Sequence, residues 1–213
     1  GQGPRAARPR DAAAVLRGVF MTPFLYLTHP QVKVDPAVPV PQWGLSDVGR
    51  ARTRAFAQDP ALRAYGRIIA STEEKAKEAA ALLAEALGLQ VEVREGLHEN
   101  DRSATGYRPE AEFQTLADAF FARPQESISG WERAVDAQAR IVAGIAASLS
   151  AAPGSPALFV GHGGVGPLLL CHLAGYPISR THDQPPVGGG CFFRAGPDET
   201  PGCWRAMEEG IRA

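Results

Sequence analysis

Residues 157–165 read Ala-Leu-Phe-Val-Gly-His-Gly-Gly-Val, the most informative stretch of the chain. The first four residues are an apolar run of strand length, and glycines stand on both sides of His162 directly after it. Glycine lets a backbone approach a ligand closely, and a helix that starts there offers unpaired N–H groups to an anion. We therefore expect His162 to meet a ligand at the end of a buried strand, with a packing histidine in a tight turn as the alternative.

Similar strand-length runs recur along the chain and alternate with segments of helical periodicity. The expected strands are residues 24–28, 67–70, 91–93 and 157–160, and the expected helices are residues 46–58, 73–87 and 131–149. Residues 188–193 and 203–208 predict two further strands in an edge hairpin. This alternation is typical of an α/β fold, so we expect a three-layer α/β/α sandwich with a mostly parallel central sheet.

Two segments carry more specific expectations. Residues 71–74, Ser-Thr-Glu-Glu, predict a capping box at the start of helix 73–87. Residues 99–128 are polar and poor in clear elements, which predicts a long loop that could cover a site.

The composition limits the classes of function. The chain has 213 residues, of which 45% are hydrophobic, enough for one globular domain with a sizeable core. A net charge of −1 predicts neither a nucleic-acid partner nor an anionic membrane surface. Three cysteines without Cys-x-x-Cys spacing favour a cytoplasmic location. No apolar run reaches the length of about 18 residues that spans a bilayer.

The first twenty residues differ from the rest, because they carry four arginines against one acid. We expect residues 1–20 to be a disordered or non-native lead, with an organelle transit peptide as the alternative. Met21 directly precedes the first strand, so the domain is expected to span residues 21–213.

Polar residues follow four of the expected strands. His29 follows the first strand, residues 71–75 the second, Glu99 the third and His162 the fourth. Ligands of open α/β sheets bind beyond the carboxyl ends of the strands, so these side chains are expected to converge. An imidazole there can attack a phosphoryl group if its other nitrogen is held in the correct tautomer. A metal site of His29, His162 and Glu99 is not favoured, because no metal-ligand spacing repeats locally.

The charged residues near these strand ends each have two interpretations. Lys75 lies in the first turn of a helix, where the dipole disfavours a cation, and is either a site residue or a surface lysine paired with glutamates. Glu99 could be held protonated in a closed pocket, and Arg102 could grip phosphate. The alternative for both is a solvated cluster on a loop. Residues 182–184, His-Asp-Gln, could line a pocket rim.

Five motifs in order resemble the histidine phosphatase (phosphoglycerate-mutase-like) superfamily. Its members have Arg-His-Gly after a strand, Leu-Thr-x-x-Gly-x-x-Gln-Ala, Ser-x-x-x-Arg-Ala, Leu-x-Glu, and a strand ending in His-Gly-Gly. This chain has Thr28-His29-Pro30, Leu45-Ser46-Asp47-Val48-Gly49-Arg50-Ala51, Ser71-Thr72-Glu73-Glu74-Lys75-Ala76, Leu97-His98-Glu99 and Gly161-His162-Gly163-Gly164. The order and spacing match from about residue 24 to residue 195, nearly all of the domain.

The resemblance implies a mechanism without a metal or organic cofactor. His29 would attack a phosphate monoester and become a phosphohistidine, and His162 would hydrogen-bond the transferring phosphoryl oxygens. Glu99 would protonate the leaving alkoxide and later activate the water that hydrolyses the intermediate. The expected partner is a small-molecule phosphate ester, with no nucleic acid and no membrane, and a homodimer is left open.

The chain departs from the family pattern in the phosphate pocket. Thr28 replaces the arginine before the nucleophile, and Lys75 replaces the arginine on the second helix. Lysine keeps the charge but loses the bidentate fork, and threonine keeps neither. Pro30 also removes a backbone N–H that the usual glycine supplies. We expect Thr28, Lys75, Arg102 and Gly163 to form the phosphate-binding set.

Three functions are compatible with these observations. The first is a phosphatase that hydrolyses phosphate monoesters through a phosphohistidine on His29. The second is a catalytically weak or inactive family member that binds a phosphorylated ligand, because pocket arginines are missing. The third is a phosphoglycerate-type mutase, although mutases of this superfamily usually add longer insertions around the pocket.

Overall fold

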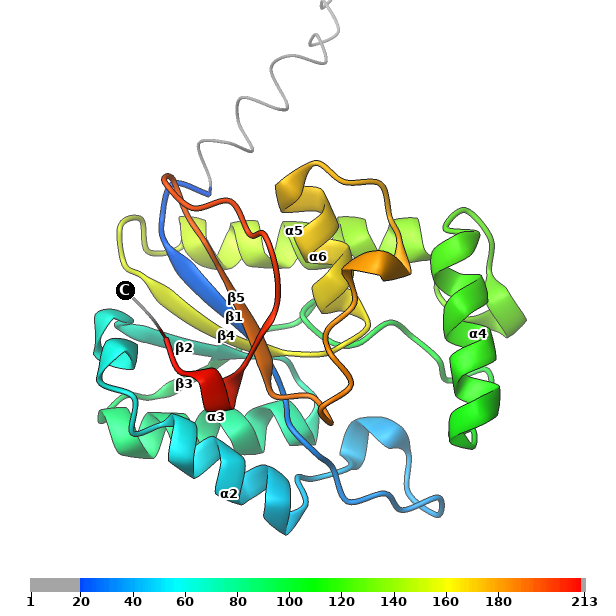
Figure 1. Cartoon of the computed structure of the whole chain (residues 1–213), viewed down its shortest axis with the longest axis horizontal. Helices are drawn as coiled ribbons and strands as arrows, with labels where there is room; N and C mark the ends of the chain where they lie inside the picture. Colours follow the sequence, from blue (N-terminus) through cyan, green and yellow to red (C-terminus); the bar gives the residue numbers. More distant parts are fainter. Residues whose placement is uncertain (1–19, 212–213) are drawn as a thin grey trace, which may run out of the picture.

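A six-stranded mixed sheet forms the centre of the molecule in the computed structural model, which describes residues 20–211. The strands are β1 (Phe24–Thr28), β2 (Arg67–Ala70), β3 (Val91–Val93), β4 (Ala157–Gly161), β5 (Cys191–Ala195) and β6 (Arg205–Ala206). Their order is β3-β2-β4-β1-β5-β6; the first four are parallel, whereas β5 and β6 are antiparallel additions (Figure 1). The expected lead at residues 1–20 lies outside the described residues, apart from Phe20.

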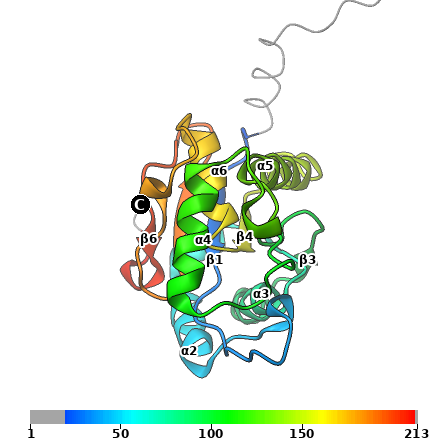
Figure 2. The same cartoon turned by 90° about the vertical axis from the view of Figure 1, so that its right-hand side faces the viewer.

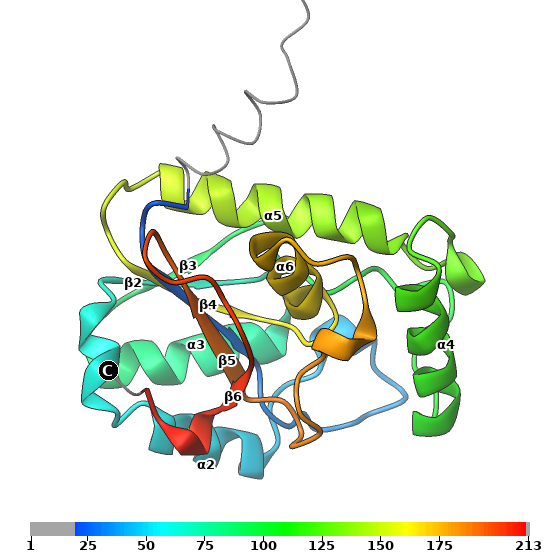
Figure 3. The ribbon, with the colours of Figure 1, turned by 45° about the horizontal axis from the view of Figure 1, so that its top comes forward.

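Helices cover both faces of this sheet. They are α2 (Asp47–Phe56), α3 (Glu74–Leu87), α4 (Glu110–Ala122), α5 (Ala134–Ser150) and α6 (Val165–Ala174). Helices α2 and α3 lie against one face, and α5 and α6 against the other (Figures 1 and 3). The predicted α/β/α sandwich with a mostly parallel sheet is therefore confirmed.

The two faces of β1 supply two separate cores. Phe24 and Tyr26 pack with the residues of α5 and α6, and Leu25 and Leu27 pack with those of α2 and α3. Adjacent side chains of a strand point to opposite faces, so a strand buried on both sides is a continuous apolar run. None of the described helices is long and apolar enough to cross a membrane.

The register between β1 and β4 brings the two strand ends to the same level. Thr28 stands opposite Gly161, and the backbone N–H of His29 donates to the carbonyl oxygen of Gly161 at 2.9 Å. Strand β2 continues the pattern, because the N–H of Ser71 donates to the carbonyl oxygen of Val160 at 3.3 Å. The residues that follow the three strands consequently share one edge of the sheet.

The predicted capping box of α3 is wrong. The residue before the helix is Glu73, and its side chain makes no capping hydrogen bond. The hydroxyl of Ser71 instead contacts His162, on the neighbouring strand end. A local sequence pattern was outweighed by a tertiary contact.

The interpretation of residues 99–128 as a loop without clear elements is also wrong, because this segment contains α4. Its buried residues, Ala117, Phe120 and Phe121, lie in its C-terminal half, so the N-terminal half has a polar sequence. Figure 1 shows α4 to the right of the sheet, and α4 is the helix nearest the viewer in Figure 2, where that side faces forward. Its Phe120 ring packs against Trp131, with ring centroids 6.1 Å apart. In the tail, β5 and β6 form the expected edge hairpin, but β6 has only two residues.

The Tyr26 side chain, which lies in the core, forms hydrogen bonds with the backbone at the end of β4. Its buried hydroxyl accepts a hydrogen bond from the His162 backbone N–H at 3.0 Å and lies 3.3 Å from the His162 carbonyl oxygen. A Cβ atom at Gly161 or Gly166 would collide with the Tyr26 side chain, which explains a glycine at both positions.

Replacing Tyr26 with phenylalanine should lower the free energy of unfolding by about 1–3 kcal/mol, because it leaves a buried N–H without an acceptor. Urea denaturation measures the change. Tyr107→Phe is the matched control, since Tyr107 is 42% exposed and should change stability by less than about 0.5 kcal/mol. Equal stability of the two variants would contradict the role given to the Tyr26 hydroxyl.

Candidate functional site

Two histidine side chains face each other at the shared strand edge. His29 follows β1 and is half-buried, whereas His162 follows β4 and is fully buried. Their ring centroids lie 5.3 Å apart, with an interplanar angle of 69°. The predicted convergence of these two residues is therefore confirmed.

A backbone carbonyl sets the tautomer of His29. The ring nitrogen Nδ1 lies 2.9 Å from the carbonyl oxygen of Pro30. A carbonyl only accepts hydrogen bonds, so Nδ1 carries the proton. Burial, together with His162 and Lys75, lowers the pKa of His29 to about 3. The ring is thus neutral near pH 7, and the lone pair is on Nε2.

The hydroxyl of Ser71, a residue for which the sequence predicted no role of its own, orients His162. His162 Nε2 lies 2.6 Å from the Ser71 hydroxyl, which accepts a hydrogen bond from the Glu73 N–H at 3.3 Å. The Ser71 hydroxyl therefore donates its own proton to His162 Nε2. Because Nε2 is the acceptor in this hydrogen bond, the proton of the neutral ring lies on Nδ1. This buried Nδ1 has no hydrogen-bond partner among residues 20–211. Burial lowers the pKa of His162, although Glu73 and Glu99 act in the opposite direction.

Lys75 lies in the site, but its charge is compensated by Glu73. The two side chains form a buried ion pair, and Lys75 Nζ also donates to the carbonyl oxygen of Val40 at 2.9 Å. Glu73 Oε1 lies 3.9 Å from His162 Nε2 and accepts from the Glu99 N–H at 2.9 Å. Burial would raise the pKa of Glu73, but His162 and Lys75 lower it to about 2. The sequence marked Glu73 only as a first-turn acid, so this carboxylate was missed.

Glu99 is held at the start of α6. Its two carboxylate oxygens accept hydrogen bonds from the backbone N–H groups of Gly164 and Val165, each at 2.9 Å. Burial would raise the pKa of Glu99, but Arg102 and His162 lower it. Donors at a helix N-terminus favour the carboxylate, so these contacts give no support to a protonated Glu99, and its protonation in a closed pocket stays a prediction.

Arg102 lies beside two aromatic rings. Its guanidinium carbon is 4.9 Å from the centroid of Phe113 and 5.8 Å from that of Trp131. No residue of the described part forms an ion pair or hydrogen bond with its side chain. The guanidinium is close enough to Glu99 to lower the pKa of that carboxylate. Arg102 is thus an uncompensated cation near the site, held by cation–π contacts.

Thr28 and Gly163 both lie against Gln184. The Thr28 hydroxyl lies 2.7 Å from Gln184 Oε1 and accepts from the Cys191 N–H at 3.0 Å. A Cβ atom at Gly163 would collide with Gln184 Nε2. The hydroxyl of Thr28 therefore has protein partners, and its assignment to phosphate binding stays a prediction, as does that of Gly163.

Asn100 is a further buried polar residue next to the site. Its side chain is 5% exposed, and Nδ2 has no hydrogen-bond partner among the described residues. Asn100 Oδ1 lies close to Gly164 at the start of α6. An asparagine in a polar segment is common, so the sequence carried no signal for this residue.

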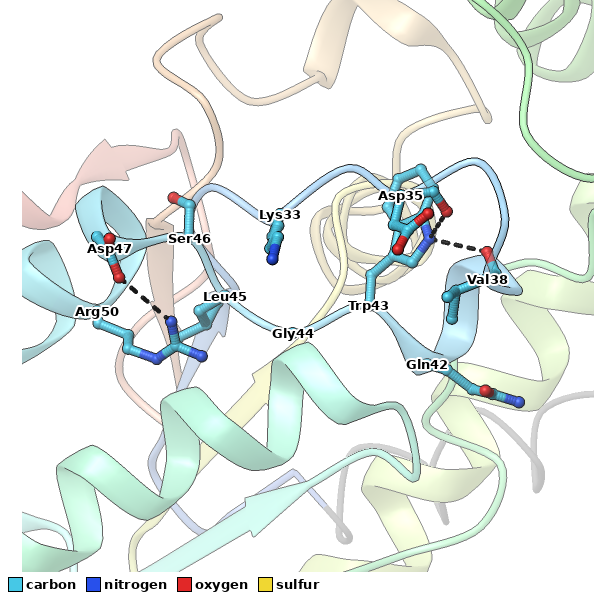
Figure 4. A pocket seen from close by; sticks show the side chains of 10 residues that line it. All are labelled: Lys33, Asp35, Val38, Gln42, Trp43, Gly44, Leu45, Ser46, Asp47 and Arg50. Carbon is cyan, nitrogen blue, oxygen red and sulfur yellow. Dashed lines mark hydrogen bonds and ion pairs between the residues drawn. The ribbon is translucent and has the colours of Figure 1, made fainter.

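A separate pocket of about 590 Å³ lies on the segment between β1 and α2 (Figure 4). It is lined by Lys33, Asp35, Val38, Gln42, Trp43, Gly44, Leu45, Ser46, Asp47 and Arg50. None of the predicted site residues lines this pocket. Across residues 20–211, no group of three or more His, Cys, Asp and Glu side chains is placed to hold a metal ion.

Solved structures share this architecture at low sequence identity. A mycobacterial glucosyl-3-phosphoglycerate phosphatase in complex with inorganic phosphate is 24% identical, with a TM-score of 0.67 over 86% of this chain and 94% of that chain. YhfR of Bacillus stearothermophilus is 19% identical, with a TM-score of 0.71 over 90% and 98%. The alpha-ribazole phosphatase of Shigella flexneri is 15% identical, with a TM-score of 0.65 over 90% and 99%.

The solved structures show a shared fold, whereas a family profile assigns the chain to a family. No curated protein sequence matches the chain. Residues 38–191, however, match the profile of the histidine phosphatase superfamily, branch 1. The matched residues include Glu99 and His162 but begin after His29. The position of His29 opposite His162 follows instead from the pairing of β1 with β4. The chain belongs to the histidine phosphatase superfamily.

Proposed function

We propose that the protein is a phosphatase that hydrolyses phosphate monoesters through a phosphohistidine on His29. The observation that carries this proposal is the hydrogen bond from His29 Nδ1 to the Pro30 carbonyl oxygen, because it leaves an unprotonated Nε2 on a neutral ring. Such a nitrogen is a nucleophile at neutral pH. The phosphatases among the structural neighbours support the same class of reaction.

In the first step, His29 Nε2 forms a bond to phosphorus while the bond to the leaving oxygen breaks. His162 Nδ1, which carries the free ring proton, donates to a phosphoryl oxygen. A bound phosphate dianion raises the pKa of the Glu99 carboxylate beside it, since like charges disfavour ionisation. Glu99 then takes up a proton in the complex and gives it to the leaving oxygen.

In the second step, water attacks phosphorus and His29 Nε2 leaves. Glu99, again a carboxylate, accepts the proton from this water. Arg102 is the cation that balances the phosphate charge in this proposal, because no described residue forms an ion pair with it. Small soluble monoesters are the proposed substrates.

A second function is favoured by one observation, the carboxylate of Glu73 beside His162. It neutralises Lys75, so this lysine adds no net positive charge of the kind that phosphoryl transfer uses. On this view the protein binds a phosphorylated ligand and turns it over slowly or not at all.

His29→Asn should abolish phosphate release from a panel of phosphate monoesters, because the nucleophile is lost. A rapid acid-free quench with a labelled ester should trap phosphohistidine in the wild type only. His172→Asn on α6 is the control and should keep wild-type activity, since His172 lies away from the strand edge. Activity that survives in His29→Asn would refute the assigned nucleophile, whereas an inactive wild type that binds phosphate would favour the second function.

Protein stability should fall as the pH decreases from 6.5 to 5. In the folded state His29 and His162 have lowered pKa values and stay neutral, whereas both take up protons near pH 6.5 when the chain unfolds. The unfolded state then binds more protons than the folded state. Each histidine therefore lowers the free energy of unfolding by up to about 1.4 kcal/mol for each pH unit of acidification. Urea denaturation at several pH values tests this, and His29→Asn should have a shallower slope. An identical slope in both proteins would contradict the neutral state of His29 in the folded protein.

Glu73→Gln should strengthen the binding of inorganic phosphate by about tenfold, because it removes a negative charge beside His162 and frees the Lys75 charge. The same change should destabilise the fold by about 3–5 kcal/mol, since a buried cation loses its partner. Titration calorimetry at a temperature where circular dichroism shows the variant folded measures the affinity. Glu74→Gln is the control, with the same charge change on a half-exposed neighbour. Equal affinities in both variants would show that Glu73 does not repel phosphate.

A further inference from the structure

Gln184 connects the residues next to the two histidines. It lies in the segment between α6 and β5, far in sequence from both strand ends. On one side its Oε1 is 2.7 Å from the hydroxyl of Thr28, the residue before His29. On the other side its Nε2 lies against Gly163, the residue after His162. The carboxamide therefore spans the edge at which the histidines face each other.

The hydrogen bonds of Thr28 determine which end of the carboxamide faces the site. The Thr28 hydroxyl already accepts a hydrogen bond from the Cys191 N–H at 3.0 Å. Its own proton has two acceptors within reach, Gln184 Oε1 at 2.7 Å and the Cys191 carbonyl oxygen at 3.2 Å, and the contact with Gln184 Oε1 is the shorter one, at an ordinary O–H···O distance. The amide nitrogen is consequently at the Gly163 end, with two N–H donors that no other described residue accepts.

The backbone around Gln184 is held in place. Its N–H donates to Asp183 Oδ1 at 2.8 Å, and Asp183 in turn pairs with Arg180. Arg180 also forms an ion pair with Asp118 on α4. An amide presented by a braced segment loses less conformational entropy on binding a ligand than one on a free loop.

We propose that Gln184 is a further phosphate-binding residue of this site, and that its Nε2 donates to a phosphoryl oxygen held between His29 and His162. The inference rests on the proposed phosphate-ester chemistry. In this arrangement Thr28, which stands where the family pattern has arginine, positions Gln184 instead of contacting the phosphate. Gly163 is required because any Cβ there would displace the amide.

A neutral donor suits the charges of this pocket. Glu73 neutralises Lys75, so Arg102 is the one cation named at this site that forms no ion pair with a described residue. An amide adds a donor without adding charge, and its hydrogen bond to an anion is stronger than one between neutral groups. The ligand it fits is the terminal phosphate of a monoester.

The first test is titration of inorganic phosphate into the wild type, Gln184→Ala and Gln184→Glu by calorimetry. Gln184→Ala should weaken binding by about 10- to 100-fold, the loss of one hydrogen bond to a charged group. Gln184→Glu should weaken it further, because a carboxylate replaces the donor. Gln58→Glu makes the same charge change at an exposed position beyond α2 and should bind phosphate like the wild type.

Two measurements separate a direct contact from a structural effect. In ¹⁵N NMR spectra, the side-chain amide signal of Gln184, assigned by its absence in Gln184→Glu, should shift on phosphate addition. Thr28→Val should weaken phosphate binding about as much as Gln184→Ala, and Thr28→Ser should rescue it, because serine restores the hydroxyl that orients the amide.

The outcomes distinguish this inference from the proposed function. Wild-type phosphate binding and ester hydrolysis that Gln184→Ala leaves unchanged, with no shift of the amide signal, would overturn the inference and leave the phosphatase in place. A wild type that neither binds phosphate nor hydrolyses any ester would overturn both. Weakened binding in both Gln184 variants, with normal binding in Gln58→Glu, supports the inference.

Discussion

The parallel pairing of β1 with β4, with Thr28 opposite Gly161, positions the two histidines around which the site is built. Because both strands end at this pair, the next residues, His29 and His162, lie side by side. A slip of one residue would exchange the two faces of β1 and place each of its apolar side chains in the opposite core. The burial of the strand on both faces therefore fixes the distance between the histidines.

The same edge of the sheet concentrates buried polar groups, and neighbouring elements satisfy most of them. Glu99 accepts from the first backbone N–H groups of α6, Ser71 contacts the His162 ring, and Tyr26 accepts from its backbone. Unpaired polar groups are costly in a protein interior, so the atoms left without partners are informative. Among the described residues they are His162 Nδ1 and Asn100 Nδ2, which belong to the strand end and to the residue after Glu99.

The charge of the pocket separates this chain from the pattern that its motifs resemble. Two arginines of that pattern are absent, and the structure adds the carboxylate of Glu73 to the lysine that replaces one of them. The remaining cation, Arg102, comes from a different segment and rests on aromatic rings. The pocket therefore has few positive charges that are not paired with an acid. A phosphate that binds between the histidines would depend more on hydrogen bonds from neutral donors.

The sequence alone determined the fold class, most strand positions, and the two histidines at the strand ends. These features depend on short apolar runs and on adjacent glycines, which are local properties. Only the tertiary structure decided that Glu73 pairs with Lys75, that Glu99 accepts hydrogen bonds from the start of α6, and that residues 110–122 form a helix. The contact of Thr28 with Gln184 joins residues 156 positions apart. Such contacts depend on how distant segments pack, and no local pattern of residues records that packing.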